Sequence, residues 1–251
     1  MSFQLSDMII PFVSRKWYNA YGREFKMIKN KTNQIVLITA LSLLACVLHG
    51  VMLFTPFNNY ATTSIVKIIL FVACPILYVF FSKDGTLKEM FLNKGDWKSI
   101  KISLLLGVGA FIVIIAGYAA IRPWLDDTMI TGALNNVGIT SQNYIFAVLY
   151  YVLINVALEE IFFRGFIFIA IYRLGHKWYA YLYSSGLFAI YHVAIMRYGV
   201  EPFLLVLATV GLAVVGLLFN YITQRCGNII GSWAIHSGAG VAIGAIGFYV
   251  L

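Results

Sequence analysis

The sequence is poor in charged residues, because Asp, Glu, Lys and Arg make up only 11% of its 251 positions. A soluble domain carries about 25% charged residues, so this scarcity argues against a soluble globular protein. Cysteines are also few, and Cys46, Cys74 and Cys226 lack the spacing of a disulfide framework or a zinc motif. The early apolar run 8–13 is short, contains Pro11 and has no small-residue cleavage site after it, which argues against a cleavable signal peptide.

Long apolar segments are what the sequence has in abundance, since 61% of its residues are hydrophobic. A stretch of about 20 apolar residues is enough for a helix to cross a bilayer. We therefore predict an all-α polytopic membrane protein, with 1–251 forming a single integral-membrane domain. About seven segments have the length of a transmembrane helix: 33–54, 63–81, 102–121, 144–172, 178–196, 203–222 and 229–251.

The basic residues predict an orientation in the membrane rather than a nucleic-acid partner, although the net charge is +8. They cluster beside the apolar segments, and residues 1–32 mix them with aromatic residues, which predicts an interfacial segment on an anionic membrane face. With the N-terminus inside, the outer loops hold only Arg122 and Arg197, which predicts an N-in, C-out topology. Lys67, near the start of the second segment, is expected to extend to the interface.

The stretch Leu158 to Gly165 places three ionisable residues inside the fourth apolar segment. A carboxylate at membrane depth costs about 2.5–3.5 kcal/mol on insertion scales, so its presence needs a reason. Glu160 and Arg164 are four residues apart and share a helix face, which predicts an ion pair. Glu159 points about 100° away and is left available for chemistry.

Two histidines are predicted to lie near these glutamates. The fourth and fifth segments form a hairpin about Gly175, and Glu160 and His192 lie at similar distances from that turn. His236 in the last segment is also at an intramembrane position. Two carboxylates and two imidazoles can therefore meet in one buried site, although a lone intramembrane histidine is equally often a structural hydrogen-bonding group.

Such a site can catalyse hydrolysis in two ways. A buried glutamate beside a histidine can take a proton from water and later give it to a leaving amine, while a second histidine donates to the oxyanion. Alternatively, Glu159, His192 and His236 can bind zinc with the other glutamate as base. The absence of the His-Glu-x-x-His spacing favours the metal-free mechanism, with no cofactor, and leaves zinc as the second choice.

Three short motifs occur in order along the chain: Glu159-Glu160-x-x-x-Arg164, Phe188-x-x-x-His192 and the later His236. Together they resemble the CPBP family, which comprises the type II CAAX prenyl endopeptidases and the bacterial Abi or bacteriocin-processing relatives. The resemblance covers about 140–245, and the N-terminal half carries no motif.

The resemblance implies a CPBP-like catalytic core in an intramembrane protease of the glutamate type. It implies that Glu159 and His192 activate water, that Glu160 and Arg164 hold the site, and that His236 forms part of the oxyanion hole. The expected substrate is a small peptide or a membrane-tethered protein.

One position departs from the family pattern. The third motif is usually His-x-x-x-Asn or His-x-x-x-Asp, and here Gly240 stands four residues after His236. The loss of one oxyanion donor typically costs about 10²–10³ in rate. Ser237 or a backbone amide is a possible substitute, and an inactive member of the family is the alternative.

Two other functional classes remain open at this stage. One is a non-catalytic membrane protein, such as an immunity or scaffold factor, which the glycine at 240 favours. The other is a proton-coupled carrier that uses Glu159 and His192 as a relay. The compact size and the family's bacterial relatives favour a bacterial plasma membrane protein, and the sequence predicts no oligomeric state.

Overall fold

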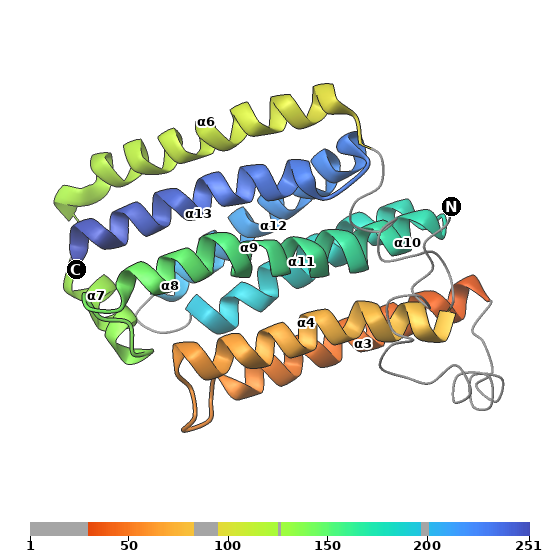
Figure 1. Ribbon diagram of the computed structural model, residues 1–251, viewed down its shortest axis with the longest axis horizontal. Coiled ribbons are helices and arrows are strands. Elements are labelled where there is room, and N and C mark those ends of the chain that lie inside the picture. The colour runs from red at the N-terminus through yellow and green to blue at the C-terminus, as the bar shows by residue number, and fades with distance from the viewer. Residues whose placement is uncertain (1–29, 83–94, 125–126, 197–200) are drawn as a thin grey trace.

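The computed structural model describes residues 30–82, 95–124, 127–196 and 201–251, and over these residues it consists of helices without a strand (Figure 1). The predicted interfacial segment therefore lies outside the described residues except for its last positions, 30–32. The described helices are α3 (Lys31–Met52), α4 (Tyr60–Ser82), α6 (Trp97–Ile121), η1 (Arg122–Trp124), α7 (Asp127–Asn136), α8 (Tyr144–Tyr150), η2 (Tyr151–Asn155), α9 (Val156–Glu159), η3 (Glu160–Ile169), α10 (Ala170–Arg173), α11 (Lys177–Met196), α12 (Pro202–Cys226) and α13 (Ile230–Val250).

Within the described ranges, six helices are long and apolar enough to cross a membrane: α3, α4, α6, the composite helix Tyr144–Arg173, α12 and α13. The predicted class, an all-α polytopic membrane protein, is confirmed. The remaining predicted span, 178–196, coincides with α11, which is 20 residues long but is not one of the six. Its serines, tyrosines and His192 make it more polar than the others. The count of seven spans and the N-in, C-out orientation therefore stay predictions.

The helix that carries the glutamates departs from regular α geometry. It runs without a break over Tyr144–Arg173, but η2 and η3 within it are π-helical. Between them lies the short α-helical turn α9, which ends at Glu159. Because π-helical turns are rare and frequently occur at functional sites, the junction at Glu159 is a local irregularity that marks this position.

The glutamate helix is the centre of the bundle. The α3–α4 hairpin lies along one side and the α6–α13 pair lies along the opposite side (Figure 1). The π-helical part η3 contacts α3, α4, α11 and α12. A side chain on η3 or at the end of α9 is therefore surrounded by other helices and shielded from lipid.

Aromatic packing fixes the position of η3 against its neighbours. The Phe71 ring of α4 stacks on Phe162 at a centroid separation of 3.9 Å, and Phe163 meets Phe188 of α11 edge to face at 5.2 Å. The outward faces of the surrounding helices carry exposed apolar side chains, for example Leu105 of α6 and Phe203 of α12. An apolar outer surface over long helices is what a bilayer solvates.

Close backbone contact fixes the position of α13. A Cβ atom at Gly238 would lie 2.1 Å from the carbonyl oxygen of Gly107 on α6, so only glycine allows this approach. At Gly244 a Cβ atom would lie 2.8 Å from Val148 of α8. These contacts hold α13 against both neighbours and thereby set the depth of His236.

Candidate active site

The five predicted site residues come together from four helical parts of the bundle. Glu159 ends α9, Glu160 and Arg164 belong to η3, His192 to α11 and His236 to α13. The two glutamates and the arginine are almost inaccessible, with exposed fractions of 3%, 0% and 0%. The expectation that the carboxylates and imidazoles meet in one buried place agrees with this geometry, whereas the roles of these residues stay predictions.

Glu159 faces both histidines. Its Oε2 atom lies 3.6 Å from Nε2 of His192 and 3.7 Å from Nε2 of His236. Its other oxygen, Oε1, accepts a hydrogen bond from Nδ2 of Asn155 at 3.2 Å. One carboxylate thus lies between two imidazole rings and is held by an amide from the preceding turn.

Glu160 forms a separate network with Arg164 and His236. Its Oε1 atom lies 3.2 Å from Nη1 of Arg164 and 2.9 Å from Nδ1 of His236. The Arg164 guanidinium is further enclosed by aromatic rings, with Phe188 at 4.2 Å and Phe219 at 4.9 Å from centroid to Cζ. The predicted i, i+4 pair is present, and it also orients the second histidine.

The hydrogen bonds of the two rings fix where their protons lie. Nδ1 of His192 contacts the Phe188 carbonyl oxygen at 2.8 Å, and Nδ1 of His236 contacts a carboxylate. Because both partners are acceptors, each Nδ1 carries the proton, and in the neutral ring Nε2 is then an acceptor. His192 can therefore accept a proton from water, whereas His236 can donate through Nε2 only as an imidazolium.

Lys67 is a member of the site that the sequence analysis placed wrongly. It does not extend to the interface but is 4% exposed, and its Nζ atom forms an ion pair with Oε1 of Glu159. The same ammonium donates to Oδ1 of Asn155 at 2.7 Å. The signal that could have found it is a lone lysine inside an apolar span, since an intramembrane ionisable residue marks a functional site by default.

Gly240 faces the glutamate helix. A Cβ atom at this position would lie 3.4 Å from both Cε1 of Tyr151 and Cγ2 of Val156, which is close but ordinary contact. The predicted departure from the family pattern therefore leaves a glycine packed next to the residues that precede Glu159. Ser237, the other predicted donor, has a buried Oγ atom without a hydrogen-bond partner among the described residues.

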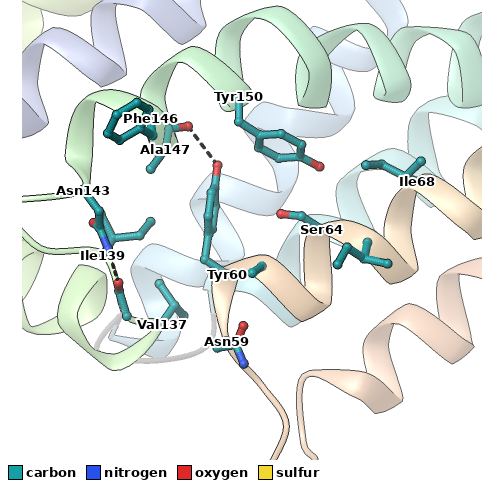
Figure 2. Close-up of a pocket in the computed structure, with 13 residues that line it drawn as sticks. Asn59, Tyr60, Ser64, Ile68, Val137, Ile139, Asn143, Phe146, Ala147 and Tyr150 are labelled. Carbon is teal, nitrogen blue, oxygen red and sulfur yellow. Dashed lines mark hydrogen bonds between the residues drawn. The ribbon is translucent and has the colours of Figure 1, made fainter.

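A cavity of about 560 Å³ lies beside the site, between the start of α4, the turn before α8 and α8 itself (Figure 2). Its lining is largely apolar, and among its polar members Tyr60 and Tyr150 meet edge to face at 5.7 Å. Tyr60 donates a hydrogen bond to the Ala147 carbonyl oxygen at 3.1 Å. Ser64 and Ile68, which also line the cavity, lie within one helical turn of Lys67 on α4, so the cavity borders the part of α4 that carries this lysine.

The zinc alternative depends on three donors that converge. Across the described ranges, no group of three His, Cys, Asp or Glu side chains is arranged to hold a metal ion. The Nε2 atoms of both histidines nevertheless face Glu159, and in the neutral rings these nitrogens carry no proton, as a metal ligand requires. Zinc on Glu159, His192 and His236 therefore stays the second choice.

The fold and the site define a polytopic membrane protein with a buried glutamate–histidine centre. Residues 141–242 match the family model described as type II CAAX prenyl endopeptidase Rce1-like. The predicted resemblance is confirmed over this part of the chain, which is similar to the type II CAAX prenyl endopeptidases. Comparison with curated proteins and with solved structures gives no significant match.

Proposed function

We propose that the protein is an intramembrane endopeptidase that hydrolyses a peptide bond with water activated by Glu159 and His192. The observation that carries the proposal is the buried Glu159 carboxylate, 3.6 Å from the acceptor nitrogen of His192, inside a segment of a protease family. Both groups face the same space, so a water molecule placed there meets two bases. No covalent intermediate and no cofactor is needed for this chemistry.

Glu160 and Arg164 have positioning roles in this mechanism. Glu160 and Arg164 compensate each other's charge, and Glu160 fixes the ring of His236 through the 2.9 Å contact at Nδ1. His236 borders the same reaction space as His192, because both Nε2 atoms face one oxygen of Glu159. We propose 140–245 as the catalytic core of a single integral-membrane domain.

The cavity beside the site supports a peptide substrate with apolar side chains. Its volume lies within the range of about 300–1,000 Å³ that is typical of ligand pockets. Tyr60, Ser64 and Tyr150 are among the few polar side chains on its largely apolar wall (Figure 2). We propose that it holds a substrate side chain next to the scissile bond of a small peptide or a membrane-tethered protein.

Cleavage of quenched peptides by purified protein tests the proposal. Wild type and Glu159→Gln are given the same peptide library in detergent, with prenylated and unprenylated versions of each sequence and with or without a chelator. We expect cleavage by wild type alone, unaffected by the chelator, since the glutamine side chain of the variant cannot act as a base. Activity that is lost with the chelator and restored by zinc would assign the site to the metal mechanism instead.

A non-catalytic immunity or scaffold protein is the second candidate, because Gly240 removes the usual donor. It predicts that Glu159→Gln retains full biological function in cells. A proton-coupled carrier is the third, and it predicts transport in liposomes without cleavage. We propose a bacterial plasma membrane as the location of the protein.

A further inference from the structure

Among the described residues, Lys67 is the ionisable group in contact with Glu159 that the proposed mechanism does not use. Its ammonium is bonded to Glu159 and Asn155, and it lies 5.1 Å from the ring centroid of Tyr191 and 5.4 Å from that of Phe71. An ammonium group has three N–H donors, so two donors are assigned to oxygen atoms and one remains. A buried lysine of this kind calls for a functional reason, because a buried ion pair is weak evidence for stability.

Donors for an oxyanion are otherwise scarce around Glu159. Position 240 has no side chain, and the Nδ1–H group of neutral His236 donates its hydrogen bond to Glu160. Ser237 follows His236 directly, which places the two side chains about 100° apart on α13. Position 240 therefore supplies no donor, and Nε2 of His236 donates toward Glu159 only when the ring is an imidazolium.

We propose that Lys67 is a catalytic residue that stabilises the oxyanion of the tetrahedral intermediate, in the role that the missing side chain at 240 has elsewhere in the family pattern. This inference rests on the proposed protease function. It is carried by the position of the ammonium on the carboxylate that acts as the base. In this arrangement the histidines lie at Oε2 of that carboxylate and the lysine lies at Oε1, so the reacting atoms are approached from both oxygens.

The charges balance in each step of this mechanism. The water oxygen bonds to the carbonyl carbon, the water proton goes to Glu159, and the electron pair of the carbonyl double bond moves to the carbonyl oxygen. The negative charge thus passes from Glu159 to the oxyanion, and Lys67 compensates it in both states. When the C–N bond breaks, the carbonyl re-forms and the leaving nitrogen takes the proton back from Glu159.

A purely structural role for Lys67 gives a different expectation. If the lysine only neutralises Glu159, a new donor elsewhere in the site does not replace it. If it stabilises the oxyanion, an asparagine at position 240 can restore part of its effect. A Cβ atom at 240 makes ordinary 3.4 Å contacts with Tyr151 and Val156, so the first atom of that side chain is accommodated beside the residues that precede Glu159.

The test compares wild type, Lys67→Met, Gly240→Asn and the double variant by kcat and KM on one cleaved peptide. We expect Lys67→Met to lower kcat by about 10²–10³ with little change in KM, because the contact with the oxyanion exists only in the transition state. We expect the double variant to recover kcat by about tenfold or more over Lys67→Met. Thermal unfolding of each variant in detergent shows that the protein is folded.

Two results would overturn the inference while leaving the protease function intact. One is a Lys67→Met variant that keeps its kcat, and the other is a loss of kcat that Gly240→Asn does not reverse in a folded protein. Lys67→Gln, which keeps a donor to Glu159 without the charge, serves the same comparison if the methionine variant does not fold. Wild-type cleavage and its loss in Glu159→Gln are measured first, so failure of the proposed function is recognised separately.

Discussion

At the scale of single residues, Arg164 carries a completely buried charge. Its side chain is 0% exposed and its carboxylate partner is Glu160, which is equally buried. Removing one member of a buried ion pair leaves the other charge without compensation and costs about 3–5 kcal/mol. We expect Arg164→Met to lower the thermal unfolding temperature in detergent strongly.

The double variant Glu160→Gln/Arg164→Met is the control for this prediction. It removes both charges, so it should be more stable than Arg164→Met alone. An unfolding temperature for Arg164→Met equal to that of wild type would show that the pair is not buried as the structure places it.

The residues of the site differ in how far the sequence could predict them. Glu160 and Arg164 were predictable because an i, i+4 pair depends only on local helix geometry. The partner of Lys67 was not predictable, because its bond to Glu159 joins residues 92 positions apart and depends on how α4 packs against the glutamate helix. A charged side chain near a helix end can extend to the membrane interface or form an ion pair inside the protein, and only tertiary packing decides between them.

At the scale of elements, the contact between α6 and α13 gives a second prediction. Gly238→Ala would place a methyl group 2.1 Å from the Gly107 carbonyl oxygen and force the two helices apart. Overpacking of this kind costs about 1–3 kcal/mol. We expect a lower unfolding temperature and a lower kcat, since α13 also carries His236.

Gly211→Ala on α12 is the matched control for this substitution. Nothing lies within 4 Å of a Cβ atom at Gly211, so the same chemical change should leave both stability and activity close to wild type. Equal behaviour of the two alanine variants would contradict the close approach of α6 and α13.

The glutamate helix also marks a limit of sequence reasoning at this scale. The predicted segment 144–172 agrees with the observed Tyr144–Arg173, because a long apolar run indicates a span by composition alone. The π-helical parts η2 and η3 were not predicted, since an expectation of about 3.6 residues per turn assumes a regular helix. The composition of an apolar run does not show whether its backbone hydrogen bonds follow the α-helical or the π-helical pattern.

At the scale of the whole molecule, the number of spans decides on which side the C-terminus lies. If the spans are the six apolar helices of the described ranges, the chain enters and leaves the membrane on the same side, and if α11 also crosses it leaves on the opposite side. We expect an N-in, C-out protein, so a phosphatase fused after Leu251 should be active and a fluorescent protein at the same place should be dark. The reverse pattern would show that α11 does not cross the membrane or that the positive-inside assignment is wrong.

The class of the molecule was predictable in full, because scarce charge and long apolar segments are incompatible with a soluble fold of this length. The arrangement of the helices was not, since the side of the bundle on which α3 and α4 lie depends on aromatic contacts such as Phe71 with Phe162. These contacts join segments far apart in the chain.

The bond between Lys67 and Glu159 has a consequence for the evolution of the family. If the lysine replaces the donor that is missing at position 240, either position can supply the hydrogen-bond donor to the oxyanion. The residues at the two positions should therefore vary together. Relatives with Asn or Asp at the position of Gly240 are expected to carry an apolar residue at the position of Lys67, and relatives with a glycine there should keep the lysine. A variant that acquires the asparagine first passes through an intermediate with both donors, so either state can be reached from the other without loss of the reaction.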